Sequence, residues 1–145
     1  MLWTTLIPAT VNPVDNQRFF TWQQYSDFLP NEPDEGGLQF WSDQMTNNCG
    51  TGYNDNNACV RNIRALVSKE FFRAAYSSAF NNNSQFVHQC YVSYLRRSVP
   101  DGDSGFQFWL GVLNSYGTPA SETGKNALID AFITSGEYRL RFGQI

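Results

Sequence analysis

The residues best suited to nucleophilic chemistry lie close together in the second half of the chain. His88 is the one histidine in the sequence, and Cys90 follows two positions later. A thiol nucleophile needs a base within hydrogen-bond reach, whereas residues two apart on a helix point to different sides. We therefore interpret His88 as a surface or half-buried side chain and Cys90 as a buried free thiol.

Acidic residues are the next candidates, because a pair of carboxylates can hydrolyse a glycosidic bond. Asp34 and Asp101 each follow a proline at the expected start of a helix, where a carboxylate accepts hydrogen bonds from free backbone amides. We interpret Asp34 and the pair Asp101 and Asp103 as residues that cap helix starts. Calcium binding by Asp101 and Asp103 is an alternative, but the segment lacks the glutamate that completes a calcium loop. We expect no metal and no cofactor.

Two cysteines flank a polar loop that is rich in glycine and asparagine. Cys49 and Cys59 have this loop between them, and no second cysteine pair or histidine cluster is available to complete a zinc site. We predict a Cys49–Cys59 disulfide, which would stabilise the fold by about 3 kcal/mol. A disulfide indicates an oxidising setting, so we expect an extracellular or cell-surface protein whose signal peptide is not in the sequence shown.

The elements that position these residues follow a pattern that occurs twice. Tyrosine and leucine precede a Pro-Asp turn, then a glycine and a Phe-Trp pair, and later a Ser-x-Glu-aromatic segment. Such repetition is typical of a duplicated supersecondary unit whose copies pack together. The matched segments are 25–29, 33–41 and 68–73 in the first half and 91–95, 100–109 and 135–139 in the second.

Apolar residues after position 17 recur at three- and four-residue steps, the spacing of one helix face. The sequence predicts an all-α fold in which two tandem similar units of about four short helices form one compact domain with an extended N-terminal arm. The predicted divisions are the arm at 1–17, the first helical repeat at 18–80 and the second at 84–145. Ser68 should cap the fourth helix of the first repeat.

Two sets of residues should occupy equivalent places in the repeats. Trp41 and Trp109 recur at matching helix positions. This recurrence favours a role in core packing over the binding of sugar rings. The caps and turns are Asp34, Gly37, Ser68, Asp101, Gly105 and Ser135, and the core residues are Tyr25, Trp41, Phe71, Tyr91, Trp109 and Tyr138.

The first residues differ from the rest of the chain. Prolines and threonines disfavour a helix, so we expect an extended arm. Its apolar side chains would be unfavourable in water, and we predict that they form a subunit interface. These residues are Trp3, Leu6, Ile7 and Val11.

Composition excludes several partners. The formal net charge is −3, with 10 basic and 13 acidic residues, which argues against nucleic-acid binding because that requires a clustered basic face. We also expect no membrane span, because no run of about 18 apolar residues occurs.

The repeated pattern resembles the bacterial "domain of unknown function 4214" family, which is similar to phycobilisome linker domains. The resemblance covers about residues 18–143, at Phe28-Leu29, Pro33-Asp34, Gly37-Leu38 and Phe40-Trp41 and their counterparts. It implies an all-helical module of exported bacterial surface proteins, and it implies no reaction. The second turn, at 100–105, is one residue longer than the first.

These features predict a secreted, non-enzymatic structural protein. It would be a self-assembling subunit of an extracellular filament, tube or surface layer, with the arm docking on a neighbouring subunit. An extracellular glycan-binding module that uses exposed aromatic side chains is the alternative. A hydrolase that uses Asp34 and Asp101 as its acid pair is a third possibility.

Overall fold

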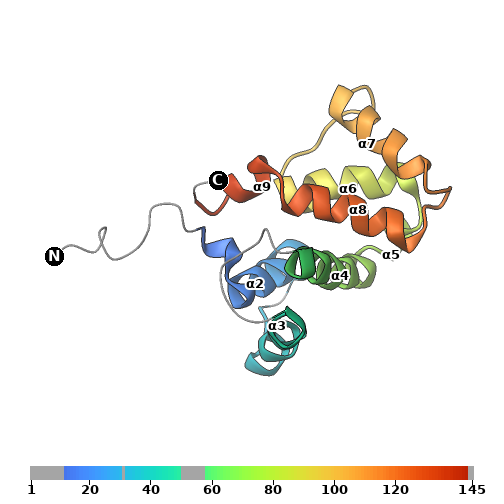
Figure 1. Cartoon of the computed structure of the whole chain (residues 1–145). Helices are drawn as coiled ribbons and strands as arrows, with labels where there is room; N and C mark the ends of the chain where they lie inside the picture. Colours follow the sequence, from blue (N-terminus) through green and yellow to red (C-terminus); the bar gives the residue numbers. More distant parts are fainter. Residues whose placement is uncertain (1–11, 31, 50–57, 144–145) are drawn as a thin grey trace.

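The computed structural model describes residues 12–30, 32–49 and 58–143. Within these ranges the chain forms eight α-helices and one 3-10 turn, without strands, so the predicted all-α class is confirmed (Figure 1). The elements are η1 (Pro13–Asp15), α2 (Gln17–Phe28), α3 (Glu35–Cys49), α4 (Ala58–Ala75), α5 (Ser77–Phe80), α6 (Asn83–Leu95), α7 (Ser104–Asn114), α8 (Glu122–Ile133) and α9 (Gly136–Leu140).

Helices α4 and α8 lie side by side along the junction of the two halves of the chain (Figure 1). In the first half α2 packs against α3 and α4, and in the second half α6 packs against α7 and α8. The outermost helices, α3 and α7, lie on opposite sides of the α4–α8 pair. The short α9 closes one end by packing on α6 and α8.

Aromatic rings join the halves into one hydrophobic core. Phe72 of α4 stacks on Phe86 of α6, with ring centroids 4.5 Å apart. Phe28 of α2 contacts Tyr94 of α6 at 5.3 Å. All four side chains are buried, and burial of a large aromatic side chain stabilises a fold by a few kcal/mol. The described residues therefore form one compact domain.

The predicted core residues divide into two groups. Phe71, Tyr91 and Tyr138 are buried, as expected. Tyr25 and the two predicted tryptophan anchors are partly buried and pack against the edge of the core. One edge of each tryptophan therefore remains accessible from outside.

Packing at the start of α3 explains why position 37 is a glycine. The Asp34 carboxylate accepts a hydrogen bond from the Gly37 amide at 2.6 Å, the interaction expected of a helix cap. A β-carbon at Gly37 would collide with the Tyr25 hydroxyl. Burial and the nearby Asp34 carboxylate both raise the pKa of Tyr25.

The same arrangement recurs at α7, but Asp103 rather than Asp101 is the cap. Asp103 accepts from the Phe106 amide at 2.9 Å, and a β-carbon at Gly105 would lie 2.6 Å from the Tyr91 hydroxyl. Asp101 lies in the predicted turn, but two residues before the cap, so it does not itself cap the helix. Its carboxylate instead bonds to His88.

The prediction for Ser68 was wrong. Helix α4 continues through Ser68, which is fully buried, whereas Ser135 does cap α9 through the Tyr138 amide at 3.2 Å. Lys69 follows Ser68 and supports a helix, while Gly136 follows Ser135 and favours a break. The two halves thus differ here as well as in the turn before α3 and α7.

The predicted disulfide is confirmed. It joins Cys49, the last residue of α3, to Cys59 near the start of α4, with the α-carbons 5.7 Å apart. The loop between them, 50–57, lies outside the described residues. The bond fixes the end of α3 against α4, which packs on α8 at the junction of the two halves.

Two glycines provide a test of packing in the second half. A β-carbon at Gly124 of α8 would lie 2.5 Å from Cβ and Cγ of Tyr116, whereas one at Gly111 of α7 would meet nothing within 4 Å. We predict that Gly124→Ala lowers the free energy of unfolding by about 1 to 3 kcal/mol. Gly111→Ala should raise it by about 0.5 to 1 kcal/mol, the gain of alanine over glycine in an exposed helix.

Urea denaturation followed by circular dichroism measures both variants. Equal effects of the two substitutions would contradict the packing of Tyr116 against α8.

Candidate functional site

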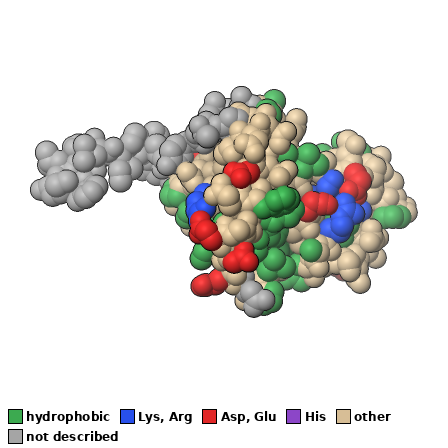
Figure 2. Space-filling view, turned by 90° about the horizontal axis from the view of Figure 1, so that it is seen from below, with side chains coloured by type: hydrophobic (Ala, Val, Ile, Leu, Met, Phe, Trp, Pro, Cys, Tyr) green, Lys and Arg blue, Asp and Glu red, His purple; other side chains and the backbone are tan. Residues whose placement is uncertain are grey.

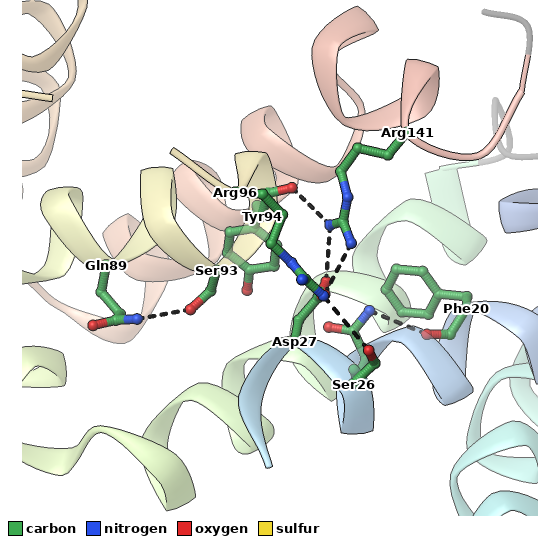
Figure 3. A network of polar contacts seen from close by, with 9 residues as sticks. Phe20, Ser26, Asp27, Gln89, Ser93, Tyr94, Arg96 and Arg141 are labelled. Atoms are coloured by element: carbon green, nitrogen blue, oxygen red, sulfur yellow. Dashed lines mark hydrogen bonds and ion pairs between the residues drawn. The ribbon is translucent and has the colours of Figure 1, made fainter. Parts of the chain in front are cut away.

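A buried carboxylate connects α2 to two segments of the second half. The Asp27 side chain has no exposed surface. It accepts hydrogen bonds from Arg96 at 2.6 Å and from both terminal nitrogens of Arg141 at 3.0 and 3.1 Å (Figure 3). Arg141 also donates to the Tyr94 carbonyl at 2.8 Å. Two cations on one buried carboxylate compensate for its desolvation, which an unpaired charge cannot do.

The backbone of Arg96 is arranged for this contact. Its φ of 58° lies in the left-handed region, where it ends α6. This conformation is uncommon for a residue with a β-carbon. It turns the chain away from the helix axis, and the Arg96 guanidinium reaches back to Asp27, as Figure 3 shows. The ion pair offsets the backbone cost at the end of α6.

A second polar network lies inside the core. Ser68 donates to the Gln24 side-chain oxygen at 2.6 Å and shares a 2.5 Å hydrogen bond with the Tyr94 hydroxyl. Gln24 in turn donates to the Phe20 carbonyl at 3.1 Å. Burial raises the pKa of Tyr94 well above its ordinary value. Ser68, which we predicted at the start of a helix, therefore links α2, α4 and α6.

The segment just before α2 belongs to the folded core. Asn12 is fully buried and donates to the Arg139 carbonyl at 2.8 Å. Asp15 accepts two hydrogen bonds from the Arg139 guanidinium at 2.6 and 3.0 Å, and its carbonyl accepts one from Arg64 at 2.6 Å. The predicted arm boundary at residue 17 is therefore wrong. Any arm ends at residue 11, and the predicted interface residues Trp3, Leu6, Ile7 and Val11 lie outside the described residues.

The His88 and Cys90 side chains have separate environments. His88 is half-buried, stacks on Phe106 with ring centroids 4.1 Å apart, and bonds to the Asp101 carboxylate at 2.6 Å. Cys90 is a free, buried cysteine, as predicted. Burial raises the pKa of its thiol well above the ordinary value, which disfavours the thiolate that nucleophilic attack requires.

The acidic candidates are engaged at helix starts. Asp34 and Asp103 each accept a backbone hydrogen bond, and Asp101 bonds to His88. In the described ranges, no group of three or more His, Cys, Asp or Glu side chains could hold a metal ion. The carboxylates of the predicted hydrolase pair thus have structural partners.

Two Phe-Trp pairs lie on the outer helices. Phe40 of α3 is 55% exposed and Phe108 of α7 is 61% exposed. Each phenylalanine meets the tryptophan that follows it edge to face, at 5.0 Å for Trp41 and 4.9 Å for Trp109. The sequence interpretation missed both phenylalanines as surface groups. The missed signal was their position: neighbours on a helix point about 100° apart, so on an outer helix that packs on one side only one of the two is directed at the core.

A hollow of about 210 Å³ lies at the end of α2 and is lined by Trp22, Ser26 and Glu32, among others. On the face shown in Figure 2, hydrophobic side chains gather in a band between two groups of charged side chains. Exposed apolar side chains on α3 and α4 include Phe40 and Leu66. Exposed aromatic side chains therefore occur on α2, α3 and α7, at Trp22, Phe40 and Phe108.

Comparisons with protein-family models, curated proteins and solved structures found no match to this chain. The resemblance to the "domain of unknown function 4214" family stays a prediction. In the part of the chain that the structure describes, no helix has the length and apolar character needed to cross a membrane.

The Asp27 cluster can be tested by removing its charge. We predict that Asp27→Asn lowers the free energy of unfolding by about 3 kcal/mol or more, because two arginines lose the carboxylate that binds both. The matched control is Glu35→Gln, which removes a carboxylate from the exposed Arg18–Glu35 pair and should change stability by less than about 1 kcal/mol.

Urea denaturation measures both variants. A loss below 1 kcal/mol for Asp27→Asn would contradict the role given to this cluster.

Proposed function

We propose that this protein is a non-enzymatic, extracellular structural subunit that assembles with copies of itself through residues 1–11. The buried attachment of Asn12 and Asp15 to α9 carries the proposal. It gives the segment a fixed point of departure from the domain. The segment contains Trp3, Leu6 and Ile7, which favour burial against another surface.

The chemistry of the described residues agrees with a structural role. Cys90 is buried, His88 bonds to Asp101, and the acidic caps hold helix starts. The Cys49–Cys59 disulfide supports an oxidising location. We assign no reaction to the protein.

Passing the arm from one molecule to the next forms a heterologous contact. Such a contact generates a ring when the rotation closes and a filament when it does not. The exposed Phe-Trp pairs on α3 and α7, which lie on opposite sides of the molecule, supply further apolar surface to neighbouring subunits. A filament, tube or surface layer is the proposed product.

The arm is tested by replacing its apolar side chains in the full chain. We predict that Trp3→Ser, Leu6→Ser and Ile7→Ser together abolish assembly, because the docking surface is lost, while the melting temperature stays unchanged. The control replaces Thr4, Thr5 and Thr10 by serine and should assemble normally. Sedimentation velocity and electron microscopy measure the outcome, and normal assembly of the first variant would refute the arm mechanism.

Glycan binding is the second candidate. The partly exposed Phe-Trp pairs and the hollow at Trp22 favour it, because aromatic faces beside polar groups suit sugar rings. Titration with sugars, followed by tryptophan fluorescence, tests this function. Saturable binding by a monomeric protein, lost in Trp22→Ala but retained in Trp3→Ala, would favour it over assembly.

A further inference from the structure

A small hollow beside the break between α8 and α9 combines aromatic and charged walls. Its volume is about 150 Å³, and polar and apolar atoms line it in about equal measure. Its partly exposed apolar walls are Leu95 of α6, Trp109 of α7 and Ala131 of α8. The Tyr91 and Phe132 rings also line the hollow and are buried. A ligand would therefore meet aromatic carbon on the inside of the hollow.

The polar groups of the hollow keep hydrogen-bonding capacity for a ligand. Arg97 donates to the Glu137 carboxylate at 2.7 and 3.1 Å. In the described part of the chain, the guanidinium has more N–H donors, and the carboxylate more acceptor sites, than these two bonds use. The two side chains are 47% and 46% exposed, so the remaining donors and acceptors face solvent next to each other.

Ser135 adds a third polar group to the hollow. Its hydroxyl donates to the Phe132 carbonyl at 2.7 Å and accepts from the Tyr138 amide at 3.2 Å. A hydroxyl has a second acceptor lone pair. Ser135 can therefore accept one hydrogen bond from a ligand without losing the bonds that hold the start of α9.

The charges of the hollow favour a neutral ligand. Glu137 would repel an anion and Arg97 would repel a cation. The Arg97 guanidinium also lies over the Tyr91 ring, 5.0 Å from its centroid, where a cationic ligand would otherwise bind. Burial and the nearby Asp103 carboxylate raise the pKa of Tyr91, so this phenol stays uncharged. A neutral molecule that both donates and accepts hydrogen bonds satisfies these groups better than an ion.

The size of the hollow limits its ligand to about one ring. Sites for drug-sized molecules measure about 300 to 1,000 Å³. A cavity of about 150 Å³, the volume of this hollow, accepts a benzene ring. A pyranose has the same number of ring atoms as benzene, and it carries hydroxyl groups that can lie at the charged edge.

Three other hollows differ in the described residues that line them. The hollow at the end of α2 has Trp22 but no arginine or lysine. The groove between α4 and α8 and the hollow between α5 and the end of α7 are lined without an aromatic ring. The hollow at Trp109 thus differs from these three in combining aromatic rings with an arginine and a carboxylate.

We infer that the hollow at Trp109 binds one pyranose unit of a neutral glycan. The inference rests on the second candidate function, glycan binding, and names its site. The C–H face of the sugar ring would lie against Trp109 and Leu95. Its hydroxyl groups would accept hydrogen bonds from Arg97 and donate to Glu137, and charge-assisted hydrogen bonds of this kind are the stronger ones.

The test titrates sugars into the isotope-labelled full chain and follows its NMR signals. The probes are the methyl glycosides of glucose, galactose, mannose and N-acetylglucosamine. We expect at least one of them to shift the Trp109 indole and Leu95 amide signals saturably. Cyclohexanol is the control ligand. It should bind roughly tenfold more weakly or worse, because one hydroxyl cannot serve both Arg97 and Glu137.

Two variants, each with a matched control, test the walls. Ala131→Leu fills the hollow and should weaken glycoside binding by roughly tenfold or more. Its control, Ala127→Leu, lies one turn earlier on α8, in the groove against α4, and should leave binding unchanged. Arg97→Met keeps the aliphatic stem but removes the donors, and should weaken binding by a similar factor. Its control is Arg18→Met, in the exposed pair with Glu35.

Melting temperatures show whether each variant is folded, and Arg97→Met decides alone if Ala131→Leu is not. The absence of a saturable shift with all four glycosides would overturn the inference, as would equal binding by the folded variants and their controls. Shifts confined to Trp22 and Ser26 would keep glycan binding as a function but move it to the hollow at the end of α2, which also overturns this site. Assembly, measured by sedimentation, depends on none of these results.

Discussion

The Asp27 carboxylate lies between Arg96 and Arg141 and has no contact with solvent. The position of the two halves relative to each other depends on this buried ion cluster. Its partners are 69 and 114 residues further along the chain. Because an unpaired carboxylate is costly in the interior, the end of α6 and the residue that follows α9 must both lie against α2. The Asp15–Arg139 pair adds the same constraint at the start of α2. The Asp15–Arg139 pair holds the segment before α2 against α9.

The polar groups of this domain act mainly in its construction. Ser68, Gln24 and Tyr94 bond to one another in the core, and the acidic residues at α3 and α7 hold helix starts. The accessible groups include aromatic side chains on α2, α3 and α7. Accessible aromatic side chains are enriched at protein–protein contacts, and this supports the proposed assembly.

Sequence reasoning succeeded where a residue's role depends on its close neighbours. The all-α class, the Cys49–Cys59 bond and the caps at Asp34 and Ser135 follow from local spacing and composition. It failed at Ser68, because a serine within a good helix-forming stretch is stabilised there by partners on α2 and α6. Asp101 lies in the predicted turn, but the longer turn gives the capping role to Asp103.

The sequence by itself determined the helices, most of their ends and the disulfide, because these features depend on residues a few positions apart. Only the tertiary structure decided that the segment from Asn12 to Gln17 is core and that Asp27 joins the halves. It also decided that Ser68 is buried in the middle of α4. These outcomes depend on side chains that are distant along the chain and meet only when α2, α6, α8 and α9 pack together.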